Sequence, residues 1–390
     1  MITKICIMLL TSLCLIISSQ ATASSFMNET ITIGLTASLS GKFKEAGTQQ
    51  LQGVEMWRDD INERGALLGK RVKLIVQDDH SIAEDAAKIY ESFILKDKVD
   101  LLLGPYSSDI TLAVANVADK YNFPLLAIAA SASSIWDKRN KPYLFGTYVQ
   151  SDQLMKHVIE FAAEKNMHRI AIAHANTHYT NSIAEGARHV AQENNMEVIF
   201  YDTFNTTNDF RKYMDRLAET KPEIIIVGAY LEDSIQFVKA LKQRKFRPKM
   251  LVFSGSIDTD EFKNALGNDV EGVLSAIQWS QAQRLPGAHD FSFRYKQKYK
   301  IHPSYQAAGG YAAGQILEAA VRLSGSLSKD DLQQQLLKLK FRSLFGHYRV
   351  GSNGQQIGKK AYLMQWQDGE RRLVMPEVIS NHTIRLFNMN

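Results

Sequence analysis

From residue 31 to residue 277 the chain alternates short apolar runs with longer amphipathic segments, and this alternation restricts the fold more than any other feature. The apolar runs are rich in valine, isoleucine and leucine, as strands buried on both faces of a parallel sheet are. The segments between them carry apolar residues at helical spacing. Strands that alternate with helices in this way predict an α/β fold with parallel central sheets covered on both faces.

The alternation comes in two series, which predict two similar α/β lobes. The expected strands are 31–35, 72–76, 99–103 and 124–129 in the first series, and 169–174, 197–202, 223–227 and 249–253 in the second. The order is less regular after a further strand at 273–277, with helices expected over 289–299, 305–323 and 328–339 and hairpins from residue 346 onward. A length of 390 residues is sufficient for two lobes with a core each.

The start of the chain differs from the rest. Lys4 supplies a positive charge, residues 5–17 are apolar, and Ala21-Thr22-Ala23 has the small-residue form of a cleavage site. This arrangement predicts a secretory signal peptide over residues 1–23 and therefore a periplasmic protein. The apolar run is shorter than a membrane-spanning helix. Both cysteines, Cys6 and Cys14, lie in this segment, so the mature chain offers none for a disulfide, thiolate catalysis or metal binding.

Charge and motifs argue against several classes of function. The formal net charge is +5, but the two signs are interleaved, which predicts no nucleic-acid or membrane-surface partner. The chain contains no phosphate-binding loop, dinucleotide fingerprint, nucleophile elbow or zinc-protease motif. His174 and His178 are four residues apart without an evident third ligand. We therefore expect no enzyme activity, no cofactor and no metal.

Ligands of open parallel sheets bind beyond the carboxyl ends of the strands, so the strand-to-helix turns are the candidate site. The turn at 104–108 offers a helix N-terminus and the Ser108 hydroxyl, although a simple helix cap is the alternative. The loop 129–134 consists of six small residues, which either leave room for a ligand or form a flexible connection. Tyr179 and Tyr230 occupy turns of the second series, where each could either pack against a small-molecule ligand or fill the hydrophobic core.

Taken in order, several motifs resemble those of the extracytoplasmic solute-binding proteins of branched-chain amino acid transporters, the leucine/isoleucine/valine-binding type. The resemblance covers about 30–376 and rests on segments 33–41, 52–57, 60–65, 68–70, 78–79, 104–108 and 346–350. It implies the type I periplasmic binding protein fold, in which two Rossmann-like lobes are joined by three hinge crossings. The crossings are expected near Thr147, Trp279 and Phe345. The N-terminal lobe would then contain 29–146 with 280–345, and the C-terminal lobe 147–279 with 346–380.

The resemblance also implies site residues. Ser108, Ala129 and Ser131 match positions that hold the α-carboxylate of an amino acid, and Tyr179 and Tyr230 match tyrosines that cover the ligand. By the same analogy, Ser108, Ala129 and Ser131 come from one side of a closing cleft and the two tyrosines from the other. We therefore expect one ligand to contact both lobes.

The position of the acid that meets the α-ammonium group departs from the family. Residues 254–257 read Ser-Gly-Ser-Ile, and an acid follows only at Asp258. An unpaired buried ammonium would cost several kcal/mol. Either Asp258 serves this group or the ligand is a carboxylate without an amino group. The resemblance implies a monomer that delivers this ligand to the membrane subunits of an ABC transporter, and the alternative is a periplasmic sensor that signals to a membrane receptor.

Overall fold

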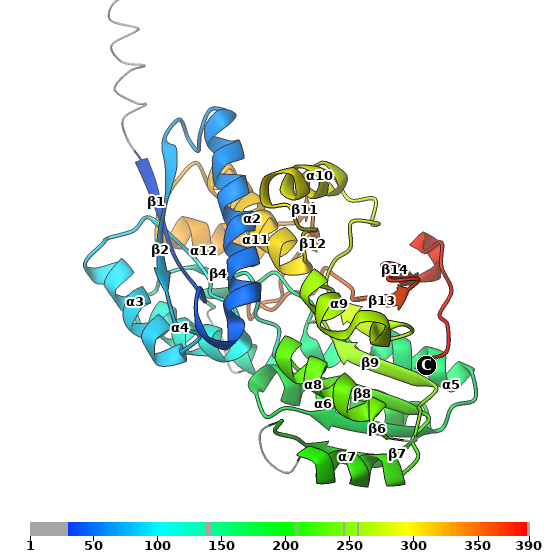
Figure 1. Ribbon diagram of the computed structural model, residues 1–390. Helices are drawn as coiled ribbons and strands as arrows, with labels where there is room; N and C mark the ends of the chain where they lie inside the picture. Colours follow the sequence, from blue (N-terminus) through cyan, green and yellow to red (C-terminus); the bar gives the residue numbers. More distant parts are fainter. Residues whose placement is uncertain (1–29, 138–141, 207–209, 245, 256, 388–390) are drawn as a thin grey trace, which may run out of the picture.

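The computed structural model describes residues 30–137, 142–206, 210–244, 246–255 and 257–387. The expected signal peptide, with Cys6 and Cys14, lies outside these residues. Figure 1 shows two α/β lobes, each with helices packed around its own sheet. The predicted α/β fold with parallel central sheets is confirmed.

The first lobe is organised around a five-stranded sheet in the order β2-β1-β3-β4-β5, in which every pairing is parallel. Its strands are β1 (Thr30–Ala37), β2 (Arg71–Asp78), β3 (Leu101–Leu103), β4 (Leu125–Ala127) and β5 (Leu144–Gly146). The helices that connect them are α2 (Lys44–Glu63), α3 (Ala83–Leu95) and α4 (Ser108–Lys120). The sequence pattern predicted the first four strands and all three helices but not β5.

Helices from much later in the chain complete this lobe. They are α10 (Ala288–Tyr299), α11 (Tyr305–Ser324) and α12 (Lys329–Lys338), and α11 lies along α2 in Figure 1. Glycines make this close approach possible. A Cβ atom on Gly53 would lie 1.9 Å from the carbonyl oxygen of Ala307, and one on Gly314 would lie 2.1 Å from the Trp57 ring. Neither position could therefore hold a side chain without moving the two helices apart.

The second lobe has a seven-stranded sheet in the order β14-β13-β10-β9-β8-β6-β7. Its strands are β6 (Arg169–His174), β7 (Glu197–Thr203), β8 (Ile224–Gly228), β9 (Met250–Ser254), β10 (Leu274–Ile277), β13 (Tyr362–Gln367) and β14 (Glu370–Met375). Strands β6 to β10 are parallel, whereas β13 and β14 extend the sheet antiparallel. Helices α5 (Lys156–Glu164), α6 (His178–Glu193), α7 (Phe210–Glu219), α8 (Leu231–Lys242) and α9 (Asp260–Leu266) accompany it.

The segments between the lobes are tied to one another. The Gln278 side chain accepts a hydrogen bond from the Val149 amide (2.9 Å) and donates one to its carbonyl (3.1 Å). The Trp279 indole donates to the carbonyl of Leu344 in the first lobe (2.7 Å).

The last change of lobe follows the short hairpin of β11 (Phe341–Ser343) and β12 (Gly346–Tyr348). Tyr348 and Val350 pack in the core of the first lobe, whereas Ala361 packs in that of the second. The chain therefore passes between the lobes after Val350, and the division expected near Phe345 falls inside the hairpin instead.

Candidate functional site

A cavity lies between the two lobes, and we call it the inner cavity. The first lobe contributes strand-to-helix turns and the N-terminal end of α11, and the second contributes the starts of α6 and α8. The residues that line the cavity are Tyr106, Ser107, Ser108, Ala129, Ser131, Tyr148, Tyr179, Tyr230, Gln278 and Tyr305. This is the edge of the parallel sheets at which α/β proteins bind ligands.

The N-terminus of α4 provides the polar end of the inner cavity. Ser107 caps the helix by accepting a hydrogen bond from the Ile110 amide (3.3 Å). The Ser108 hydroxyl oxygen accepts the amide protons of Ser131 (3.2 Å) and Ala132 (3.1 Å), which fixes the small-residue loop against the helix. Because that oxygen is already an acceptor, its own proton is available to an acceptor in the cavity. A hydroxyl donor at a helix N-terminus is suited to an anion such as a carboxylate.

Five tyrosines form most of the wall: Tyr106, Tyr148, Tyr179, Tyr230 and Tyr305. Burial raises the pKa of Tyr106 to about 12 and raises the pKa values of the other four hydroxyls further. All five are therefore neutral at physiological pH and can both donate and accept hydrogen bonds. Among the residues that the structure describes, no lysine, arginine, aspartate or glutamate lines this cavity.

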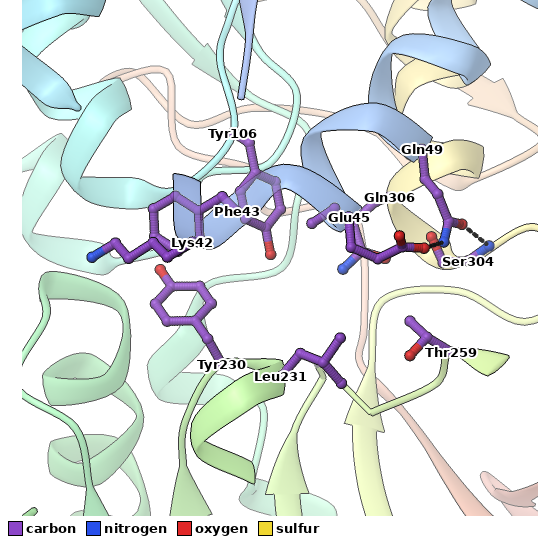
Figure 2. Close-up of a pocket in the computed structure, with 11 residues that line it drawn as sticks. Lys42, Phe43, Glu45, Gln49, Tyr106, Tyr230, Leu231, Thr259, Ser304 and Gln306 are labelled. Atoms are coloured by element: carbon purple, nitrogen blue, oxygen red, sulfur yellow. Dashed lines mark hydrogen bonds between the residues drawn. The ribbon is translucent and has the colours of Figure 1, made fainter. Parts of the chain in front are cut away.

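Aromatic rings from both lobes meet at the entrance to the inner cavity. The Tyr230 ring lies 4.8 Å from the Phe43 ring, 6.5 Å from Tyr106 and 5.5 Å from Tyr179, measured between centroids. Phe43 and Tyr106 belong to the first lobe, whereas Tyr179 and Tyr230 begin helices of the second. Figure 2 shows Tyr230 approaching Phe43 and Tyr106 from the opposite ribbon. These contacts hold the lobes together at this point.

A second, outer cavity lies beyond these rings and shares Tyr106 and Tyr230 with the inner one. It is also lined by Lys42, Phe43, Glu45, Ala46, Gln49, Leu231, Thr259, Ser304 and Gln306. The Gln49 side chain donates to the Glu45 carboxylate (2.6 Å) and accepts from the Ser304 amide (3.1 Å), as the dashed lines in Figure 2 mark. Charged groups are thus present here, outside the tyrosine-lined space.

Two polar contacts join the lobes beside the inner cavity. Asp109 in the first turn of α4 accepts a hydrogen bond from the His178 ring in the first turn of α6, with 2.7 Å between Nδ1 and Oδ1. Ser182 in α6 accepts one from the Ser133 amide (3.4 Å). The first turns of α4 and α6 are therefore linked directly to each other.

Five of the six residues predicted as the site come together. Ser108, Ala129, Ser131, Tyr179 and Tyr230 all line the inner cavity. Their roles in ligand binding stay predictions.

Asp258 is placed differently. It lines a separate cavity with Trp279, His302 and Arg371, and its Oδ2 accepts the Tyr305 amide proton (3.4 Å). Arg371 donates to the backbone carbonyl of Asp258. The Asp258 carboxyl nevertheless lies near enough to the inner cavity to raise the pKa values of Tyr106 and Tyr179.

Sequence reasoning missed five lining residues, Tyr106, Ser107, Tyr148, Gln278 and Tyr305. Tyr106 belongs to the 104–108 turn that was singled out, so it could have been found from its position beside Ser108. Tyr305 begins α11, whose place in the first lobe depends on the long return of the chain. Tyr148 and Gln278 lie on lobe crossings, where strand and helix periodicity carries no signal.

Two α/β lobes joined by chain crossings, with a cavity enclosed between them, define a two-lobed ligand-binding protein. Residues 30–371 match the family model described as periplasmic binding protein, and the chain belongs to this family. It is 22% identical to the Leu/Ile/Val-binding protein homolog 7 of Brucella abortus, over 91% of this chain and 94% of that protein.

Solved structures show the same fold. The substrate-binding protein LivJ of a branched-chain amino acid transporter from Streptococcus pneumoniae, in complex with isoleucine, superposes with a TM-score of 0.81. The two chains are 22% identical over 89% of this chain and 100% of that one. A solute-binding protein of an ABC transporter from R. palustris, in complex with benzoate, gives a TM-score of 0.80 at 19% identity over 88% and 95% of the chains.

The family is one of periplasmic binding proteins rather than enzymes. Within the part of the chain that the structure describes, no helix has the length and apolar character that a bilayer crossing requires. Over the same residues, no three His, Cys, Asp or Glu side chains converge as a metal site would require.

Proposed function

We propose that this chain is a secreted solute-binding protein that captures a small carboxylate or amino acid between its lobes and delivers it to the membrane subunits of an ABC transporter. The observation that carries the proposal is the inner cavity, which has a hydroxyl donor at a helix N-terminus on one lobe and tyrosines on the other. A ligand bound at Ser108 and covered by Tyr230 stabilises only the arrangement in which both lobes contact it. Binding then shifts the population of open and closed forms toward the closed one.

The family and the ligands of the structural relatives support this role. LivJ of Streptococcus pneumoniae was crystallised with isoleucine and the R. palustris protein with benzoate, and both ligands carry a carboxylate. The proposal includes export through the signal peptide over residues 1–23, action in the periplasm as a monomer, and no catalytic step.

A thermal-shift screen of the mature protein against amino acids and against aliphatic and aromatic carboxylates tests the proposal. A compound at about 100 times its Kd adds roughly 3 kcal/mol to the free energy of unfolding and raises Tm visibly. Ser108→Ala should abolish or sharply reduce the shift, because the donor at the helix N-terminus is lost. Ser328→Ala removes a cap of α12, outside both cavities, and should lower Tm without changing the ligand-induced shift.

Two outcomes would count against the proposal. Binding that is insensitive to Ser108→Ala would show that the carboxylate lies elsewhere. Tight binding without any loss of solute uptake in a deletion strain, but with an altered gene response, would instead favour a sensor that signals to a membrane receptor.

A further inference from the structure

Lys359 connects the last crossing between the lobes to an aromatic ring of the first lobe. This crossing consists of residues 351–360. The Lys359 Nζ atom is buried and lies 3.0 Å from the centroid of the Phe345 ring. The stem of the side chain lies against Gly346, where a Cβ atom would be 3.4 to 3.7 Å from three carbons of the lysine. Lys359 therefore reaches from the crossing back onto the β11–β12 hairpin.

The charge of this amine would be poorly balanced in the closed arrangement. Among the residues that the structure describes, none forms a hydrogen bond with the Lys359 Nζ atom. The attraction of a ring face for a cation is smaller than the cost of burying an ammonium group without a negative partner. Burial lowers the pKa of the Lys359 amine well below its ordinary value, and no neighbouring charge among the described residues offsets it. The closed arrangement thus favours the neutral form of the side chain.

The amine borders a more polar environment on its other side. Although Nζ is buried, Lys359 as a whole is half-buried and lines an open cavity beside the first and last crossings, which we call the hinge cavity. The other titratable residues that line the hinge cavity are Asp152, Lys156, His157 and Lys360. The Tyr148 ring faces the amine at 5.7 Å from Nζ. A rotation of the lysine stem would place the ammonium group in the hinge cavity, where water and the Asp152 carboxylate stabilise its charge.

Ring contacts lead from Phe345 to the inner cavity. The centroids of Phe345 and Tyr148 lie 5.0 Å apart, and those of Tyr148 and Tyr305 lie 5.8 Å apart. The Tyr148 hydroxyl also donates a hydrogen bond to the Tyr305 carbonyl (3.3 Å). Both tyrosines line the inner cavity, whereas Lys359 lines the hinge cavity. Lys359 therefore acts on a bound compound through these rings and through the crossing itself.

We propose that Lys359 is a positioning residue that couples closure of the lobes to the loss of one proton at the hinge. Opening moves the crossing relative to the hairpin, so the amine leaves the Phe345 ring for the hinge cavity and takes up a proton from water. Closure reverses both steps and returns the proton to water. Because a bound compound favours the closed form, it expels this proton, and loss of the proton strengthens binding in return. This inference rests on the proposed function and adds a pH response to it.

The direction of the pH response follows from the proton count of the two forms. The closed form lowers the pKa of Lys359 and so holds fewer protons than the open form, which means that affinity rises with pH. The rise begins at the pKa of the closed form and ends at about 10.4, the value of an exposed lysine. Within this window the affinity increases by up to about tenfold per pH unit.

An NMR titration of the Lys359 amine tests the coupling directly. The mature protein is isotope-labelled at lysine Cε, and Lys359→Met identifies the resonance. The probe is isoleucine, benzoate or another compound of the thermal-shift screen, whichever raises Tm most. Saturation with the probe should lower the pKa of Lys359 by about one unit or more, which corresponds to a tenfold change in affinity across the window. A pKa that is the same with and without the probe would overturn the inference.

Two variants separate the effect of Lys359 from other titrations, such as that of Asp258. Lys359→Met keeps an unbranched side chain on the Phe345 ring but has no proton to lose. It should bind the probe about tenfold more tightly than the wild type at about pH 6, and calorimetry should show this advantage shrink as the pH rises to about 9. Lys360→Met removes the neighbouring exposed lysine and should change neither the affinity nor its pH profile. A merely structural role of Lys359 would give a ratio of variant to wild-type affinity that is constant with pH, and this result would contradict the coupling.

The proposed function and the coupling fail in different ways. If no compound of the thermal-shift screen raises Tm, the proposed function is overturned and the coupling with it. If a probe binds but leaves the pKa of Lys359 unchanged, the coupling alone is overturned and the proposed function stands.

Discussion

The ring centroids of Phe43 and Tyr230 lie 4.8 Å apart, although the two residues belong to different lobes. Phe43 precedes α2, the first helix of the first lobe, and Tyr230 immediately precedes α8 in the second. A change in the angle between the lobes must separate these rings. The Phe43–Tyr230 contact therefore belongs to the closed arrangement and contributes to its stability.

Removal of this ring should weaken ligand binding. Tyr230→Ala deletes two ring contacts between the lobes, each worth about 0.5–1.5 kcal/mol beyond area burial, so we expect a loss of affinity of tenfold or more. Tyr230→Phe keeps the rings in contact and should lose less. Calorimetry with the tightest carboxylate from the screen measures both. Wild-type affinity in Tyr230→Ala would show that the two lobes do not clamp the ligand at this residue.

The Asp109–His178 contact should also favour the closed form, but only modestly. The two side chains are 35% and 47% exposed, and exposed ion pairs contribute about 0.2–1 kcal/mol. We expect Asp109→Asn or His178→Gln to weaken binding by about two- to fivefold at low salt, with a smaller effect at 1 M salt. Arg188→Gln removes an ion pair with Glu185 within α6 and serves as the control. An equal loss of affinity in the control would exclude an inter-lobe cause.

Asp258 should make stability dependent on pH. Burial raises the pKa of its carboxyl to about 7, against about 4 in an unfolded chain. Because the folded state holds the proton more tightly, the free energy of unfolding falls as the pH rises from about 4 to about 7. Above pH 7 the cost is constant and amounts to roughly 4 kcal/mol at about 1.4 kcal/mol per pH unit.

Asp258→Asn removes this cost and keeps an oxygen that can accept the Tyr305 amide proton. The variant should therefore be more stable than the wild type at pH 8, and the difference should vanish near pH 4. Denaturant unfolding across this range measures it. The same substitution at the exposed Asp97 should produce no comparable pH-dependent gain. A variant that is destabilised at pH 8 would contradict the expectation.

Like charges from the two lobes act on each other near the outer cavity. The pKa of Glu261 in the second lobe is raised by burial and then by the negative charges of Glu45 in the first lobe and Glu232. Glu45→Gln keeps a partner for Gln49 but removes this repulsion, so closure should become easier and affinity should rise by about twofold. The gain should shrink as the pH falls through the pKa of Glu261, because protonation relieves the same repulsion. An affinity gain that is independent of pH would point to another cause.

The sequence pattern predicted the strands that local apolar runs form and the turn residues that directly follow them. Apolar runs such as 169–174 and 224–227 are long enough to indicate buried parallel strands, and the position of Ser108 after such a run located the polar end of the cavity. Strand β5 was missed because it has only three residues and is held by its pairing with β4. Helix α9 was missed because a seven-residue helix carries little periodicity.

The rest of the site depends on contacts between distant parts of the chain. Tyr148 and Tyr305 are 157 residues apart, and a hydrogen bond joins the hydroxyl of the first to the carbonyl of the second (3.3 Å). The backbone carbonyl of Asp258 is likewise held by Arg371, more than 100 residues later. No local pattern encodes either relationship.

The glycine contacts between α2 and α11 have a consequence for the order in which the chain can fold. Helix α2 is among the first elements to be synthesised, but the partner that fits against Gly53 begins only at residue 305. The parallel strands β6 to β10 of the second lobe, by contrast, lie within one uninterrupted stretch. The lobe that begins the chain therefore cannot complete its core until most of the polypeptide has been synthesised.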